Sequence, residues 1–115
     1  MNAAKNTSVQ YDNCLAICKK IFLNKAKDYG TSWRVYRTIS IADQIYIKAW
    51  RIRQLQEGII QQIEDTDESE FMAIVNYGII GNILLLKNID SSKEIPLNEV
   101  EQHYDETASN IKALM

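Results

Sequence analysis

The chain has 115 residues, of which 46% are apolar and 24% are charged, and its formal net charge at pH 7 is −2. This balance is typical of one globular domain and argues against direct nucleic-acid binding, which normally requires a basic surplus. A chain this short buries a smaller fraction of its surface than a larger domain does, so we expect it to form a homo-oligomer, with a dimer as the simplest case.

The first ten residues contain no apolar core of a signal peptide. The most apolar run, residues 71–86, is interrupted by glycine and asparagine and is shorter than the roughly 20 residues of a membrane span. We therefore predict a cytoplasmic protein that does not enter a membrane, in which this run is a buried core helix.

Apolar residues recur at spacings of three and four from about residue 10, which predicts an amphipathic helix over residues 10–28. Gly30 ends this helix in the prediction, because glycine readily adopts the positive φ of a helix terminus. Cys14 and Cys18 lie four residues apart on one helix face, so we expect both to be core thiols rather than metal ligands or a disulfide.

Residues 31–39 are predicted to form a loop, and a second helix is predicted over residues 41–63. Ser40 and Asp43 have the spacing of a capping box, with Asp in place of the usual Glu. One face of this helix is an apolar stripe with Lys48 in its middle. The opposite face also carries apolar side chains, so we expect both faces to be covered. This opposite face carries Asp43, Tyr46, Ile47 and Trp50.

A third helix is predicted over residues 68–88, because its acidic start complements the positive end of the helix macrodipole. Ala73 and Gly81 on one of its faces would let another helix approach closely.

Pro96 is predicted to occupy the first turn of a fourth helix over residues 97–114. The apolar positions of that helix are Val100, Tyr104, Ile111 and Leu114.

The twelve residues from Tyr104, Y-D-E-T-A-S-N-I-K-A-L-M, echo the twelve from Tyr11, Y-D-N-C-L-A-I-C-K-K-I-F, at an offset of 93. Both contain Tyr-Asp, a basic residue eight positions after the Tyr, and an apolar ending. Chance and an internal repeat both explain the match. In the repeat interpretation, residues 1–92 are one helical domain, and residues 93–115 begin a second, truncated repeat that packs as a fourth helix.

These elements predict an all-α, four-helix bundle-like fold. The second and third helices form its central antiparallel pair, and the loop K-A-K-D-Y-G-T-S-W-R, residues 25–34, lies across their ends. This loop concentrates charge, aromatic rings and a glycine hinge.

Three blocks of the sequence resemble, in order and spacing, the nucleotide modification associated domain 1 family, formerly a domain of unknown function. They are K-A-K-D-Y-G-T-S-W-R, D-Q-I-Y-I-K-A-W-R-I-R-Q-L and E-F-M-A-I-V-N-Y-G-I-I-G. The resemblance implies a small helical domain linked to nucleotide metabolism and modified-base synthesis. Some members carry two copies in tandem, which agrees with the internal echo.

A looser similarity to the MazG-type all-α nucleoside triphosphate pyrophosphohydrolases implies magnesium held by paired carboxylates on two helices. Carboxylates at i and i+3 point the same way and can share a hard cation. Here Ala73 stands three residues after Glu70, where an acid would be expected, and Asp67 with Glu70 is the substitute pair. The second helix has no E-x-x-E, so both departures argue against magnesium-dependent hydrolysis in this chain, although bound magnesium remains an expectation of the resemblance.

The predicted function is a nucleotide-binding or nucleotide-handling domain, in which cations bind phosphate and an aromatic ring stacks on a base. The phosphate contacts are Lys25, Arg34, Lys48 and Arg51. The base platform is Tyr29 or Trp33. The polar or metal contacts are Asp28, Asp43 and Glu70, and Asn76 and Tyr77 are further nucleotide-binding residues.

Each of these assignments has a structural alternative. Trp33 could pin the loop in a core groove, Lys48 could form an internal salt bridge to Glu70 or Asp28, and Asn76 could join two helices. The rival function is therefore a non-catalytic, self-associating interaction module. His103, the only histidine, is expected on the surface with no role, and one imidazole argues against covalent hydrolase chemistry.

Overall fold

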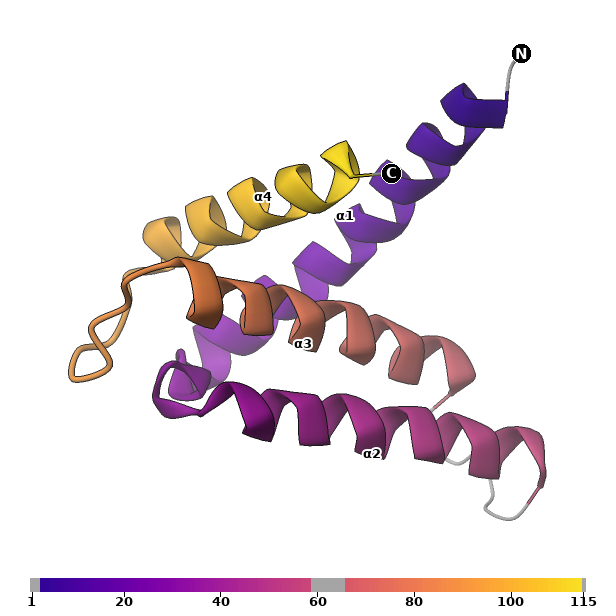
Figure 1. Cartoon of the computed structure of the whole chain (residues 1–115), viewed down its shortest axis with the longest axis horizontal. Coiled ribbons are helices and arrows are strands. Elements are labelled where there is room, and N and C mark those ends of the chain that lie inside the picture. The colour runs from indigo at the N-terminus through magenta and orange to yellow at the C-terminus, as the bar shows by residue number, and fades with distance from the viewer. Residues whose placement is uncertain (1–2, 59–65, 115) are drawn as a thin grey trace. The chain divides into compact units, whose positions relative to one another are not determined.

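The computed structural model describes residues 3–58 and 66–114, with backbone alone for residues 3–5. These residues form four α-helices, one short 3-10 helix and no strand, which confirms the predicted all-α fold (Figure 1). The elements are α1 (Ala3–Tyr29), η1 (Ser32–Val35), α2 (Thr38–Gln56), α3 (Asp67–Leu86) and α4 (Leu97–Ala113). Residues 1–31 and 93–115 form one compact unit, and residues 32–92 form another.

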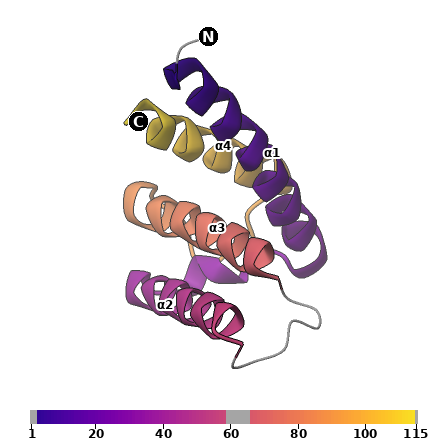
Figure 2. The same cartoon turned by 90° about the vertical axis from the view of Figure 1, so that its right-hand side faces the viewer.

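In the first unit, α1 and α4 pack antiparallel (Figure 2). Tyr11, early in α1, donates a hydrogen bond of 2.8 Å from its hydroxyl to the backbone oxygen of Ala108, late in α4. Farther along α1, the ring of Phe22 lies 4.8 Å from the ring of Tyr104, which is fully buried. Large aromatic groups of this kind dominate the burial of small cores, so this contact is the centre of the unit.

Two ion pairs between α1 and α4 are reciprocal. Lys19 Nζ lies 2.9 Å from Asp105 Oδ1, and Lys112 Nζ lies 2.8 Å from Asp12 Oδ1. The offset of 93 makes Asp12 equivalent to Asp105 and Lys19 equivalent to Lys112, so equivalent residues exchange partners as in a twofold interface. Each exposed pair contributes at most about 1 kcal/mol, so the pairs fix the register of the helices more than their stability.

The end of α1 is tied to the segment before α4. Gly30 has a φ of 72° and donates from its backbone nitrogen to the oxygen of Ala26, which confirms it as the helix stop. Next to it, the Glu94 carboxylate accepts hydrogen bonds from the backbone nitrogen and the hydroxyl of Thr31, at 2.5 and 2.6 Å. A Cβ added to Gly30 would lie 2.9 Å from the same carboxylate oxygen, so glycine is required here by both conformation and space.

The predicted burial or exposure of three side chains in this unit was wrong. Cys18 is buried, but Cys14 is exposed, because a step of four residues rotates about 40° around a helix and carries Cys14 off the buried face. His103 is largely covered rather than on the surface, with Nε2 3.6 Å from Glu99 Oε1. Leu114, predicted to be an apolar packing position, is exposed beyond the last turn of α4.

In the second unit, α2 and α3 form the predicted antiparallel pair (Figure 1). The predicted capping box of Ser40 and Asp43 is wrong, because α2 begins at Thr38 and the backbone nitrogens of Ser40 and Ile41 already donate to the oxygen of Arg37. The helix ends at Gln56, and Gly58 follows with a φ of 73°. Residues 59–63 of the predicted helix lie outside the described residues.

Before α2, the predicted loop contains η1, in which Trp33 is buried. The backbone nitrogen of Tyr36 donates to the oxygen of Trp33 and closes this short turn.

The start of α3 is fixed by a capping box that the sequence prediction missed. The hydroxyl of Thr66 accepts from the backbone nitrogen of Ser69, and the hydroxyl of Ser69 accepts from the backbone nitrogen of Thr66. Asp67 is therefore inside the first helical turn. Farther along, a Cβ on Gly81 would meet a methyl group of Ile41 at 3.4 Å, which supports the predicted close approach of α2 at this glycine.

The apolar outer sides of this pair differ from the prediction. In α3, Ile79, Ile80 and Ile83 are buried, but Phe71, Val75, Leu85 and Leu86 are exposed, so it is not a fully buried core helix. In α2, the second apolar face is also exposed rather than covered. By length and composition α3 could cross a membrane, which is weak evidence because core helices of soluble proteins meet the same criterion.

Replacing Gly30 by Ala should lower the free energy of unfolding by about 2 kcal/mol or more, because a left-handed conformation and a contact with Glu94 both oppose the new Cβ. Gly58→Ala is the matched control, since Gly58 has the same φ and nothing within 4 Å of the added atom. It should cost only about 1 kcal/mol in urea titrations followed by circular dichroism. Equal losses would show that the Glu94 contact is unimportant.

The two cysteines should differ in reactivity. Burial, together with the neighbouring Cys14, raises the pKa of the Cys18 thiol to about 11, whereas Cys14 is exposed. Labelling with a thiol reagent at pH 8 should modify Cys14 rapidly and Cys18 only on unfolding. Cys14→Ser should abolish the fast phase, and two fast phases in the native protein would contradict the packing of Cys18.

The raised pKa of Cys18 also predicts a loss of stability at alkaline pH. The unfolded thiol ionises near its ordinary pKa of 9.0, but the folded thiol ionises only at about 11. The stabilising contribution is therefore complete below pH 9 and is lost as the pH rises from 9 to 11. Cys18→Val, which cannot ionise, should show a smaller alkaline loss over this window in the same unfolding assay.

Candidate functional site

Three charged side chains meet between α2 and α3, and we call them the Glu70 cluster: Lys48, Arg51 and Glu70. Lys48 Nζ lies 3.3 Å from Glu70 Oε2, and Arg51 Nε lies 3.1 Å from Glu70 Oε1. Lys48 and Arg51 are three residues apart and share the face of α2 that is turned to α3. The capping box at Thr66 places Glu70 in the first turn of α3, opposite both cations.

The electrostatics of this cluster follow from its burial. The Glu70 side chain is 1% exposed, whereas those of Lys48 and Arg51 are 29% and 40% exposed. A buried carboxylate without partners would cost several kcal/mol, so each of its oxygens lies beside a different cation. Two cations lie beside the same anion and both are more exposed than it is, so cationic groups form the exposed side of the cluster.

The pair Asp67 and Glu70, predicted to bind magnesium, does not present two available carboxylates. Both Glu70 oxygens lie beside the cations of α2, and Asp67 accepts a hydrogen bond of 3.3 Å from Gln56 Nε2. Among the described residues, no group of three or more His, Cys, Asp or Glu side chains could hold a metal ion. A divalent cation would have to displace Lys48 and Arg51, so this donor set does not fit magnesium as it stands.

The remaining predicted residues of α3 separate by helical rotation. Tyr77 follows Glu70 by seven residues, which returns it to within about 20° of the same side, where it is half-buried. Asn76 follows by six residues and is buried on a side about 120° away. Tyr77 is therefore placed near the cluster's face, and Asn76 belongs to another face of α3.

Asp43 lies on the other side of α2 from the cluster. It precedes Lys48 by five residues, which places it about 140° away around the helix, and it is exposed. The structure therefore does not bring Asp43 to the Glu70 cluster.

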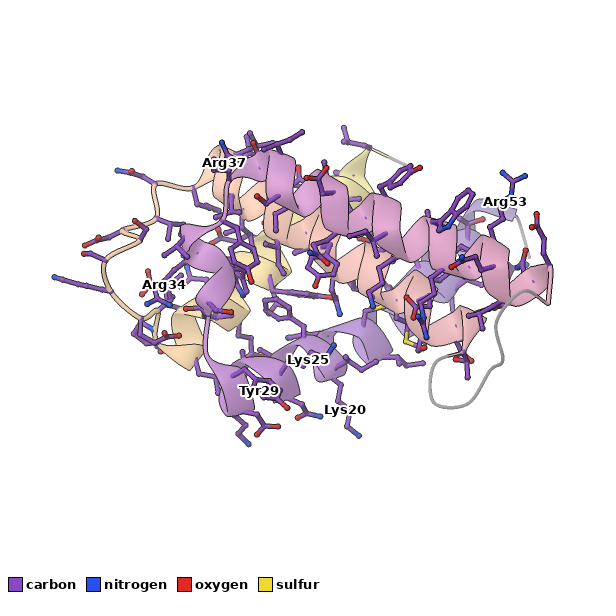
Figure 3. All side chains as sticks on the ribbon, turned by 90° about the horizontal axis from the view of Figure 1, so that it is seen from below. Lys20, Lys25, Tyr29, Arg34, Arg37 and Arg53 are labelled. Atoms are coloured by element: carbon purple, nitrogen blue, oxygen red, sulfur yellow. The ribbon has the colours of Figure 1, made fainter. Side chains whose placement is uncertain are left out.

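The predicted aromatic platforms differ in accessibility. Trp33 in η1 is buried, which favours its alternative role of pinning the loop in the core, and the neighbouring Arg34 is half-buried. Tyr29, at the end of α1 in the other unit, is 79% exposed. Lys25 (Figure 3) and Asp28 on the same turns are also exposed. Convergence of Lys25, Asp28 and Tyr29 with the Glu70 cluster stays a prediction.

Sequence reasoning missed two positioning groups. The T-x-x-S spacing of Thr66 and Ser69 carries the signal of a capping box, although Ser replaces the usual Glu. Glu94, which holds Thr31 directly after the K-A-K-D-Y-G segment, carries no such signal because it lies 63 residues away in the chain.

Comparison with protein families gives one match to these elements. The family model of nucleotide modification associated domain 1 matches residues 25–85, from the last turns of α1 through α3. The chain belongs to this family. The matched range includes Tyr29, the whole Glu70 cluster and the Thr66 cap.

No curated protein and no solved structure matches the chain. Similarity to the MazG-type pyrophosphohydrolases is not shown by these comparisons, and it stays an expectation from the sequence.

The strength of the Glu70 cluster can be measured by a double-mutant cycle. Lys48→Met should lower the free energy of unfolding by about 1–3 kcal/mol, because Glu70 is left buried with one cation. Glu70→Gln in the same chain should recover part of that loss, giving a coupling energy of at least about 0.5 kcal/mol.

The matched control is the exposed pair of Arg53 and Glu57 on the same helix, whose Nε and Oε1 lie 2.9 Å apart. Its coupling should not exceed about 0.5 kcal/mol. A coupling at the Glu70 cluster no larger than that of this control would contradict its burial.

Proposed function

We propose that this domain binds nucleotides and that Lys48 and Arg51 contact the phosphate groups. The observation that carries the proposal is the Glu70 cluster, in which a buried carboxylate holds two partly exposed cations. Parts of both cations are exposed at the protein surface, where they can attract a phosphate group. A fully buried ion pair would offer no such attraction.

Preorganisation supports the same proposal. A free lysine or arginine side chain loses about 2 kcal/mol of rotamer entropy when it is fixed by a ligand. Glu70 already restricts Lys48 and Arg51, so less of this entropy remains to be lost on binding. Charge-assisted hydrogen bonds to phosphate are strong, and an arginine can form two of them in parallel.

The family supports the class of ligand but names no substrate or reaction. Its description links the domain to nucleotide modification, which agrees with a phosphate-bearing ligand. Arg34, in the same unit as the Glu70 cluster, is a further proposed contact. Lys25, Asp28 and Tyr29 belong to the other unit, and their part in nucleotide binding stays a prediction from the sequence. A cytoplasmic location, where free nucleotides are abundant, is part of the same proposal.

We also propose that residues 93–115 begin a second repeat. The echo at an offset of 93 and the reciprocal pairs Asp12–Lys112 and Lys19–Asp105 support it, since both involve the same equivalent positions. In this proposal α4 corresponds to α1, and their antiparallel packing is a contact between repeats.

The proposed function is tested by thermal shift and calorimetry with a panel of nucleoside mono-, di- and triphosphates, each with and without magnesium. A ligand at 100 times its Kd should add about 2.7 kcal/mol of stability, which raises the Tm by several degrees. Lys48→Gln and Arg51→Gln should each weaken binding at least about tenfold. Calorimetry below the Tm of the variants separates lost binding from lost stability.

Arg37→Gln is the control, because Arg37 is an exposed arginine at the start of α2 that lies outside the cluster (Figure 3). It should bind with the affinity of the wild type. Absence of binding to every nucleotide would reject the function and favour a non-catalytic interaction module. Binding that survives in both cluster variants but not in Tyr29→Ala would move the site to the end of α1.

A further inference from the structure

The outer side of α2, opposite the face that carries Lys48, has exposed apolar side chains that the proposed function does not use. We call this side the α2 stripe; it consists of Ile39, Asp43, Tyr46, Trp50 and Arg53, with Ile47 beside it, so that two charged residues flank its apolar centre. Its spacings alternate between four and three residues, as in the a and d positions of a heptad. Tyr46 is 70% exposed and Trp50 is 49% exposed, and both isoleucines are exposed as well. Such an apolar patch on a small domain marks an interaction site.

The α2 stripe is independent of the Glu70 cluster. Tyr46 and Trp50 are each two residues from Lys48, which places them about 160° away from it around the helix. A partner on the stripe would therefore leave Lys48 and Arg51 accessible from their own side. Self-association and nucleotide binding can be tested separately for the same reason.

The charges on the stripe identify the partner. Asp43 lies near its beginning and Arg53 (Figure 3) near its end, and both are exposed. When two copies of α2 run antiparallel with residue 46 opposite residue 50, Asp43 of each copy lies opposite Arg53 of the other. The same register stacks Tyr46 on Trp50 twice at the centre. A parallel pair would instead oppose Asp43 to Asp43, which is repulsive.

The side chain of Arg53 is already held at the end of the stripe. Its guanidinium carbon lies 5.7 Å from the centre of the Trp50 ring, and its Nε lies 2.9 Å from Glu57 Oε1. Arg53 is therefore oriented over the aromatic part of the surface. An incoming Asp43 would meet a guanidinium whose position is largely fixed, with donors besides the one bound by Glu57.

We propose that the partner is a second copy of this chain, which docks through the α2 stripe in an antiparallel, twofold-symmetric helix pair. Each contact then occurs twice, as in isologous dimers. The exposed side of α3, with Phe71, Val75 and Leu85, is also apolar. It carries no pair of opposite charges that would fix the orientation of a partner.

The proposal is tested on the full chain by sedimentation equilibrium and by tryptophan emission over a dilution series. The wild type should dimerise, and the emission should shift to the blue as concentration rises, because Trp50 becomes covered whereas Trp33 is already buried. Asp43→Arg and Arg53→Asp should each raise the dimer Kd at least about tenfold, since two attractions become repulsions. The double variant D43R/R53D should return the Kd to within about threefold of the wild type.

Lys20→Asp, at an exposed lysine of α1, is the matched charge-reversal control and should leave the dimer Kd unchanged (Figure 3). Circular dichroism of each variant checks that it remains folded. A wild type that stays monomeric at millimolar concentration overturns the proposal. A dimer unaffected by either single reversal overturns the assignment to α2, and loss without recovery in the double variant overturns the antiparallel register.

Discussion

The buried carboxylate of Glu70 is the constraint on which the α2–α3 unit depends. A charge that is 1% exposed must be compensated inside the protein, and Lys48 and Arg51 supply the compensation from the facing helix. Three requirements follow for the sequence: two basic residues one turn apart on α2, a cap that begins α3 just before Glu70, and small residues such as Gly81 that let the helices approach. All three lie within the segment that the family model matches.

Burial of this carboxylate is also what connects structure to the proposed chemistry. Two cations lie beside one carboxylate, and the cations are more exposed than the anion. The exposed parts of both cations are therefore on the outward side of the cluster, in an orientation that Glu70 restricts before any ligand arrives. A hydrophobic contact at the same place would join the helices equally well, but it would not attract phosphate.

The helix α2 serves two purposes on its two sides. Its inner side carries the Glu70 cluster, and its outer side carries the exposed stripe with Tyr46 and Trp50. The other unit is organised differently, by the buried contact of Phe22 with Tyr104 and by exposed, reciprocal ion pairs. The tie between Glu94 and Thr31 holds the segment that precedes α4 against the end of α1. Packing therefore determines the stability of this unit, and charge determines its register.

The sequence by itself determined the helices, because hydrophobic periodicity, the glycine at position 30 and the acidic start of α3 are local signals. The sequence also indicated that Lys48 could form a salt bridge to Glu70 or Asp28, because a lysine on an apolar helix face requires a partner or a route to solvent. It left a phosphate contact as the other alternative. It did not determine the ends of α2, where backbone hydrogen bonds to Arg37 and the conformation of Gly58 took precedence over the spacing of Ser40 and Asp43.

Only the tertiary structure decided which apolar and charged residues are covered. Cys14 and Cys18 have the same local pattern, as do the two faces of α2, yet one member of each is buried and the other is exposed. It also separated Asn76 and Asp43 from the Glu70 cluster, and it brought Glu94 to Thr31 across 63 residues. Burial and long-range contacts depend on which surfaces meet in space, and the local sequence specifies only the surfaces that each helix can offer.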